Sequence, residues 1–380
     1  MGPSHPAMHG TIKLNLVVDG EKVVKCDTEI GFLHRGFEKM SEQSTWTQVF
    51  PYTDRLNYVS AMMNNTGYAM AVEKLLDVDI PERAKYIRVI VCELSRISDH
   101  LTCIAANAME MGAFTPYFYT MQARELIWRM FDALCGGRCT TNYVRIGGVS
   151  QDLPDGFYEE YKSIRPKLVE LIDDTDRLLT KNRIFIDRMR GVSVVSAEMA
   201  INYGFTGPCL RASGVPYDVR KAHPYLVYDR LDFEIPTGEH DDNFDRYWMR
   251  MFEMRQSLRI VDQAFEQLPD GPVIVDDPRV ALPPKEKVYN SIEGMICHFK
   301  LITDGIQVPA GEAYSYTEAA NGELGFYVVS TGGGRPWKCR VRPPCFAIMQ
   351  ALGVMVEGEM IADIIPTFDT INMIGGECDR

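Results

Sequence analysis

The sequence predicts an α+β protein in which a core of long helices carries an N-terminal β-hairpin and a C-terminal β-meander. Asp19-Gly20 separates two runs of alternating apolar and polar residues, a strong hairpin signal. Between residues 53 and 178, four helical patterns are joined by short loops, which favours a bundle. Near the end, Asn321-Gly322 and Gly332–Gly334 separate strand-like runs. We expect one structural unit with three parts: a hairpin and loop (1–50), a helical bundle (51–190) and a mixed α/β remainder (191–380).

Composition excludes several classes of protein. A net charge of −12 over 380 residues argues against nucleic acid as a main partner, because phosphate binding needs a basic face. No apolar run reaches the roughly 18 residues needed to span a membrane, and no signal peptide is recognisable. The ten cysteines form no CxxC pair, so we expect reduced thiols in a cytosolic protein.

The expected elements follow from caps, turns and periodicity. In the first half they are a hairpin over Thr11–Cys26, a short helix after Gly36 that ends before Pro51, a helix capped by Thr53 or Asp54 that runs to about Val78, a helix from Pro81 to Gly112, a helix from Thr115-Pro116 to Gly136-Gly137, and a helix capped by Asp155 that passes Leu178. In the second half they are helices over Ser196–Asn202, Asp242–Leu268 and Pro284–Thr303, a strand over Val227–Ile235, and a meander of Ala313–Glu318, Gly325–Ser330 and Pro336–Val341.

The first ten residues, Met1–Gly10, combine two histidines with two prolines and two glycines. Such a segment is predicted to be a stiff loop that presents His5 and His9, side chains that hydrogen-bond and titrate near neutral pH. The alternative is an ordinary terminal turn with exposed histidines. No nucleotide-phosphate motif is present, because Gly332–Gly334 lacks the Lys-Ser/Thr of a P-loop. We therefore expect that the chain binds no cofactor of its own.

Short blocks spread over the whole chain resemble the quinone-site core subunit of proton-pumping NADH:quinone oxidoreductase (respiratory complex I). The blocks are Met1–Gly10, Ile30–Lys39, Pro51–Tyr58, Ala71–Leu76, Ile87–Ile90, Arg145–Val149, Leu210–Gly214, Tyr217–Lys221, Glu253–Leu258 and Gly376–Arg380. They occur in the order of the family, so chance agreement is negligible.

The resemblance implies a fold like that of the large subunit of nickel–iron hydrogenases. Those enzymes hold nickel with two CxxC pairs, which align here with Asn57 and Ser60 and with Ile374 and Glu377. Because the nickel ligands must be thiolates, no nickel–iron site is expected. The old metal cavity is expected to contribute to a quinone pocket shared with the neighbouring iron–sulfur subunit.

By the same resemblance, His9 and Tyr58 match the residues that hydrogen-bond the two quinone carbonyls. Glu110 stands where the family has an aspartate that partners the histidine, one methylene shorter than the glutamate here. Arg35 matches an arginine beside the terminal [4Fe–4S] cluster of the neighbouring subunit. Thr140 replaces a histidine that many relatives have close to that cluster, and its loss should lower the cluster potential and weaken its pH dependence. We therefore expect a low-potential acceptor such as menaquinone.

The implied function is that of a peripheral-arm core subunit on the cytoplasmic side of the bacterial inner membrane, next to a membrane-arm subunit at the quinone entrance. Electrons would come from NADH through FMN and clusters in other subunits, and quinone reduction would drive proton translocation. Alternatives are the equivalent subunit of a ferredoxin-fed complex, or a hydrogenase-like scaffold without catalysis. The chain begins at a motif that relatives place some way in, so an N-terminal extension is expected to precede it.

Overall fold

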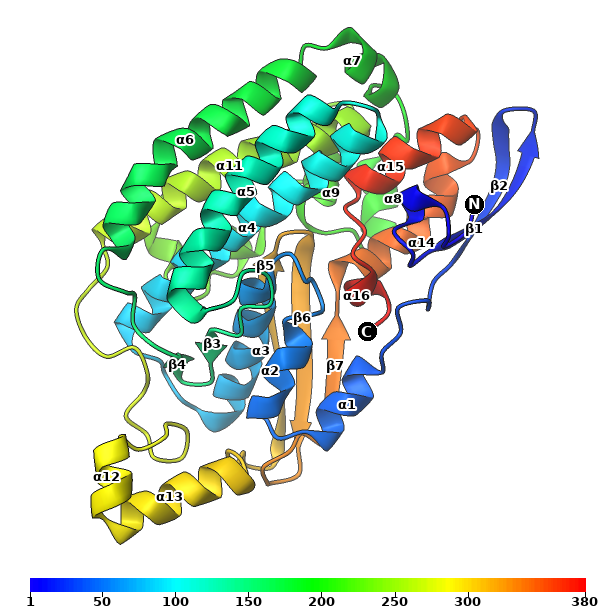
Figure 1. Ribbon diagram of the computed structural model, residues 1–380. Coiled ribbons are helices and arrows are strands. Elements are labelled where there is room, and N and C mark those ends of the chain that lie inside the picture. The colour runs from blue at the N-terminus through cyan, green and yellow to red at the C-terminus, as the bar shows by residue number, and fades with distance from the viewer.

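In the computed structural model, which describes residues 1–380, the long helices lie side by side next to a three-stranded antiparallel sheet (Figure 1). The bundle consists of α4 (Glu82–Glu110), α5 (Phe114–Cys135), α6 (Phe157–Leu179) and α11 (Asn243–Glu266). Helix α4 packs against both α5 and α11, so it occupies the centre of the bundle. No helix of the chain is both long and apolar enough to cross a bilayer.

Helix α3 (Ala61–Leu76) connects the bundle to the sheet, because it packs against α4 on one side and against β5 and β6 on the other. The sheet has the order β5 (Gly311–Ala319), β6 (Gly322–Ser330) and β7 (Lys338–Arg342). The approach of helix and sheet requires Gly67, since a Cβ there would lie 3.1 Å from the ring of Phe326. A large apolar core fills the space between these layers.

A second, smaller core lies under the N-terminal hairpin. Strands β1 (Lys13–Asp19) and β2 (Lys22–Glu29) pair antiparallel and pack on α14 (Pro344–Val356). The end of the chain is attached to the same region, because the Asp379 carboxylate accepts hydrogen bonds from the N–H groups of Gly31 and Leu33 at 2.8 and 2.7 Å. The two termini therefore lie on the same side of the molecule (Figure 1).

The remaining elements are shorter. They are η1 (Pro6–Met8), α1 (Phe37–Gln43), η2 (Thr47–Val49), α2 (Phe50–Thr53), β3 (Val144–Arg145), β4 (Gly148–Val149), α7 (Arg183–Met189), α8 (Ala197–Asn202), α9 (Gly207–Ala212), α10 (Val219–Ala222), η3 (Tyr228–Arg230), α12 (Lys285–Asn290), α13 (Ile292–Thr303), η4 (Ile361–Asp363), α15 (Ile364–Thr370) and α16 (Gly375–Cys378). Helices α12 and α13 project from the rest of the chain (Figure 1).

The predicted α+β class is confirmed, with the helical core, the N-terminal hairpin and the C-terminal meander in place. The cap at Asp242 is also confirmed, since its side chain accepts from Asp245 N–H. The start predicted at Thr53 or Asp54 is wrong, because the helix begins at Ala61. Both side chains hydrogen-bond Asn65 instead of capping a helix. Asp155 makes no cap either, because Gly156 takes the left-handed conformation (φ 81°) at the start of α6.

Two further predictions fail for tertiary reasons. Residues 227–235 form no strand, because side chains of α11 take up their backbone donors: Gln263 accepts from Asp232 N–H, and Gln256 accepts from Glu234 N–H. The helix expected over 284–303 is broken at Ser291, whose extended backbone and side chain cap α13. The sequence interpretation also missed α14.

Five elements meet at a network of buried charges around Glu93 of α4. The Glu93 carboxylate bonds Arg96 of the same helix, Arg220 of α10 and Ser257 of α11. Burial opposes its ionisation, but Arg96 and Arg220 outweigh burial and lower the pKa of Glu93 to about 2.

The network continues through Arg211 of α9, whose guanidinium contacts Asp218, Glu253 of α11 and Glu318 of β5. Glu253 also bonds His100 of α4 at 2.9 Å. All of these side chains are buried. Each ion therefore depends on partners from other elements, which fixes how α4 sits against α9, α10, α11 and β5.

We predict that Glu93→Gln lowers the free energy of unfolding by about 3–5 kcal/mol, because it leaves two buried guanidinium groups without their carboxylate. Asp187→Asn is the matched control, since the Asp187–Arg183 pair is largely exposed and its loss should cost less than about 1 kcal/mol. Denaturant unfolding of both variants measures the difference. Equal, small effects would contradict the structural role given to the network.

Candidate functional site

His9 is presented by a short, stiff segment at the start of the chain. Residues Pro6–Met8 form a single 3-10 turn, η1, in which the His5 imidazole accepts from Ala7 N–H at 3.2 Å. Ala7 and Met8 are buried and anchor the turn. His9 follows in the left-handed region (φ 52°), an uncommon conformation for a residue other than glycine. The segment therefore holds one imidazole, His9, in a defined orientation.

The His9 ring bonds the last residue of α4. Its Nε2 lies 3.0 Å from Oε1 of Glu110, so the glutamate is long enough to reach the histidine. Because a carboxylate can only accept, Nε2 carries the hydrogen and Nδ1 stays available to another group. The edge of the Phe368 ring packs against the imidazole, with 5.7 Å between ring centroids.

A second carboxyl group, Asp369 of α15, joins this pair. Ligand atoms of His9, Glu110 and Asp369 all lie within 4.8 Å of one another. Asp369 is 3% exposed, and neither of its carboxyl oxygens has a hydrogen-bond partner; Oε2 of Glu110 has none either. Burial raises the pKa of Asp369 well above its usual value, and the nearby Glu110 adds to the effect. One proton can therefore serve both carboxyl groups at neutral pH.

His9, Asp369 and Tyr58 line one cavity of about 80 Å³. Tyr58 lies in the loop between α2 and α3 and is 40% exposed. Partial burial raises the pKa of Tyr58, so the phenol keeps its proton at neutral pH. The other lining residues are Val59, Thr102, Cys103, Ala106, Phe368, Asn372, Met373 and Ile374. The structure thus brings the predicted residues His9 and Tyr58 to one cavity, with Glu110 bonded to His9.

Asp99 of α4 holds two walls of this cavity together. Its carboxylate accepts from the Asn57 amide at 2.8 Å and from the Asn372 amide at 2.7 Å. All three side chains are buried. Asn57 directly precedes Tyr58, and Asn372 itself lines the cavity. The position of Tyr58 relative to the C-terminal wall therefore depends on a single carboxylate.

The two segments that align with the hydrogenase CxxC pairs pack directly on each other. A Cβ on Gly376 would lie 2.4 Å from the carbonyl oxygen of Leu56, so only glycine permits this contact. The four aligned positions, Asn57, Ser60, Ile374 and Glu377, contain no sulfur. This donor set does not fit a nickel–iron centre, whose ligands are thiolates. Burial instead raises the pKa of Glu377 to about 7.

Arg35 and Thr140 do not line the cavity. The Arg35 guanidinium donates to the carbonyl of Arg55 at 2.6 Å, and burial lowers its pKa. Thr140 lies in the loop that follows α5. That loop is tied to the Tyr58 region where Asn142 N–H donates to the Asp54 carboxylate at 3.2 Å. Both residues therefore flank segments that carry the cavity.

Sequence reasoning missed Asp369, Asn372 and Cys103. Asp369 lies in a tail whose residues read only as apolar and then polar. The signal was present, because Asp369 is the one charged residue in Ile364–Ile374, and an isolated charge in an apolar stretch is rarely buried without a function.

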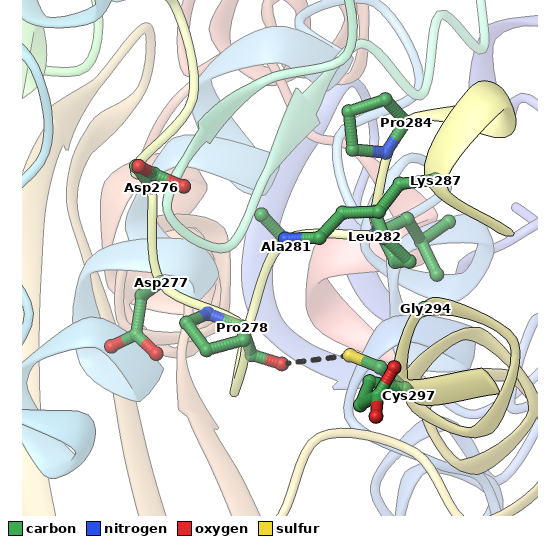
Figure 2. A pocket seen from close by; sticks show the side chains of 11 residues that line it. Asp276, Asp277, Pro278, Ala281, Leu282, Pro284, Lys287, Gly294 and Cys297 are labelled. Atoms are coloured by element: carbon green, nitrogen blue, oxygen red, sulfur yellow. Dashed lines mark hydrogen bonds between the residues drawn. The ribbon is translucent and has the colours of Figure 1, made fainter. Parts of the chain in front are cut away.

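A larger hollow, of about 290 Å³, lies beside α12 and α13 and contains none of the predicted residues (Figure 2). Its polar side chains include Asp276, Asp277, Lys287 and Glu293. The Cys297 thiol donates weakly to the Pro278 carbonyl across its edge, at 3.5 Å. Asp277 is already paired with Arg279, which lowers its pKa. No titratable cluster comparable with that at His9 is present here.

The sequence profile of the family described as "Respiratory-chain NADH dehydrogenase, 49 Kd subunit" matches residues 110–380. Curated relatives, all of them D-type subunits of NADH-quinone oxidoreductases, align with the whole chain. The relative from Myxococcus xanthus is 58% identical, with 92% of its length covered. One from Anaeromyxobacter dehalogenans is 59% identical (88% covered), and one from Geotalea uraniireducens is 47% identical (97% covered).

The chain belongs to this family.

Membership in the 49 kDa subunit family confirms the resemblance seen in the sequence and the enzyme class that it implied. The protein is a subunit of an NADH-quinone oxidoreductase, and it works with other subunits of that complex. The mixed helix and sheet architecture agrees with the 49 kDa subunit fold.

Glu377 should make the stability of this 49 kDa-type protein vary with pH. Its carboxyl pKa is about 7 in the folded chain against a usual 4.5, so the folded state binds the proton more tightly. The contribution is fully present below about pH 4.5 and is lost as the pH rises to about 7, a change of about 3 kcal/mol at most. Glu377→Gln should flatten the pH dependence of the unfolding midpoint between pH 5 and 8. An unchanged slope would contradict the pKa.

Proposed function

We propose that this chain forms, together with an iron–sulfur subunit, the pocket in which the complex reduces quinone. The observation that carries the proposal is the convergence of His9 and Tyr58 on one cavity, with Glu110 hydrogen-bonded to the imidazole. Imidazole and phenol are the two side chains here that can each donate a hydrogen bond to a carbonyl at neutral pH. A quinone presents two such carbonyls.

Reduction of a quinone to a quinol takes up two electrons and two protons. In this proposal the electrons come from NADH through FMN and iron–sulfur clusters held by other subunits, the last a [4Fe–4S] cluster next to this chain. Tyr58 donates its O–H to one carbonyl oxygen, and His9, as an imidazolium, donates Nδ1–H to the other. Glu110 stabilises the positive charge on His9 while the imidazole waits to release its proton.

The size of the cavity supports a shared pocket. About 80 Å³ is well below the roughly 300–1,000 Å³ of typical ligand sites, so this chain supplies only part of the walls. Tyr58 is also 40% exposed, which leaves its ring free to meet a partner subunit or the quinone head group. We therefore assign the missing wall to the iron–sulfur subunit, and the quinone entrance to a membrane-arm subunit.

Arg35 and Thr140 are proposed to face the terminal cluster. A guanidinium beside the cluster favours its reduced form, and Arg35 comes from the segment tied to Arg55, close to Tyr58 in the chain. Thr140 offers no titrating group, so the cluster potential should be low and nearly independent of pH. A low-potential quinone such as menaquinone is the acceptor that fits this potential.

Coupling to proton translocation and a peripheral position on the cytoplasmic face of the membrane are parts of the same proposal. Two alternatives give different results. If the complex were fed by ferredoxin, it would lack NADH oxidation but keep the dependence on His9 and Tyr58. If the chain were a scaffold without catalysis, substitutions in the cavity would leave turnover unchanged.

We predict that Tyr58→Phe and His9→Ala each lower quinone reductase activity of the assembled complex by about 10²-fold or more, because each removes a proton donor. Glu110→Gln should lower it less, since His9 keeps a hydrogen-bond partner but loses a charge. Tyr289→Phe is the control, because Tyr289 lies on α12 and is 83% exposed. Near-normal activity in both Tyr58→Phe and His9→Ala would refute the pocket assignment.

We also predict that Thr140→His raises the midpoint potential of the terminal cluster and makes it depend on pH, because a protonatable neighbour stabilises the reduced form. Redox titration followed by electron paramagnetic resonance of the assembled complex at several pH values measures the effect. A wild-type cluster that already has a high, strongly pH-dependent potential would contradict the assignment of menaquinone.

A further inference from the structure

Three potential metal ligands from distant parts of the chain face one another at the cavity. His9 comes from the loop after η1, Glu110 from the end of α4 and Asp369 from α15. Their ligand atoms lie within 4.8 Å of one another. They differ from an ordinary acidic cluster in that the chain leaves carboxyl oxygens of both acids unpartnered.

The unpartnered atoms are buried. Asp369 is 3% exposed and the Glu110 side chain is 10% exposed, yet both oxygens of Asp369 and Oε2 of Glu110 lack a hydrogen bond. An unsatisfied buried oxygen costs about 1–3 kcal/mol, and more when it is charged. A bound cation removes this cost for both carboxylates at once.

We propose that His9, Glu110 and Asp369 form a three-ligand site for a divalent transition-metal ion such as Zn²⁺, and that the bound ion blocks the quinone pocket. The blocking effect rests on the function proposed above, whereas the binding does not. An imidazole nitrogen with two carboxylates suits Zn²⁺ and related ions, while Mg²⁺ and Ca²⁺ prefer oxygen ligands alone.

The geometry is already near that of a zinc site. Ligand atoms about 2.0–2.2 Å from a tetrahedral ion stand roughly 3.3 Å apart. His9 Nε2 and Glu110 Oε1 are 3.0 Å apart, so an ion that displaces the proton between them needs little movement of these two groups. The Asp369 carboxyl must approach by about 1.5 Å at most, which side-chain rotation can supply. The fourth ligand position would belong to water or to a partner atom.

A bound ion would act on quinone reduction in two ways. It would occupy the His9 nitrogen and remove the proton that His9 shares with Glu110. It would also take space in a cavity of only about 80 Å³ that His9 and Asp369 both line. Cys103 lines the same cavity, but its thiol donates to the Asp369 carbonyl and burial raises its pKa to about 12, so it is not a ligand.

The test uses the purified complex with Zn²⁺ as the probe. Equilibrium binding and zinc-edge X-ray absorption report the site itself, and quinone reduction reports its effect, with NADH:ferricyanide reduction as a reaction that bypasses the quinone pocket. We expect a first shell of nitrogen and oxygen with one imidazole, and inhibition of quinone reduction alone. Asp369→Asn should weaken both zinc binding and inhibition about tenfold or more, measured relative to the activity of the variant itself. His9→Gln, on the N-terminal loop, should do the same if Asp369→Asn fails to assemble.

Cys103→Ser is the matched control, since it changes a cavity side chain without removing a proposed ligand, and its zinc affinity should equal that of the wild type. Zinc affinity unchanged by Asp369→Asn and His9→Gln, or lost in Cys103→Ser, overturns the metal site. Zinc binding that depends on Asp369 but leaves quinone reduction intact supports the metal site and overturns the quinone pocket. The two proposals therefore fail separately.

Discussion

The buried carboxylate of Glu93 and the arginines around it set the arrangement on which the rest of the structure depends. A buried ion is tolerated only when its partners come close in good geometry. Arg220 of α10 and Ser257 of α11 both bond Glu93, so α4 has one position relative to these helices. Glu110 lies 17 residues further along the same rigid helix, about 25 Å away. The network thus determines where Glu110 meets His9.

Helix α4 organises the functional region along its whole length. Glu93 ties it to the bundle, Asp99 holds the segments that carry Tyr58 and the C-terminal wall, and Glu110 bonds His9. The side chains that carry chemistry therefore sit on, or are held by, one element. This arrangement is suited to a protein whose pocket is completed by a partner, because the walls it contributes are already rigid before the partner binds.

Predictions from the sequence succeeded where the evidence was local and failed where a distant side chain intervened. Asp19-Gly20 and the cap at Asp242 each act through neighbouring residues, and both elements form as expected. Residues 227–235 read as a strand, but glutamines of α11 bind their backbone. His9 and Tyr58 were identified only through the resemblance to a family, because nothing in their own neighbourhoods distinguishes them from ordinary core or surface residues.

The sequence by itself determined the class of fold, the family and the absence of thiols at the four positions aligned with the hydrogenase ligands. These features follow from periodicity, turn residues and residue type, which are written in the order of the amino acids. Only the tertiary structure decided that Asp369 joins His9 and Glu110, and that burial shifts the pKa of Asp369 and Glu377. His9 and Glu110 are 101 positions apart, and their distance and solvation depend on how whole helices pack. No local pattern encodes that packing.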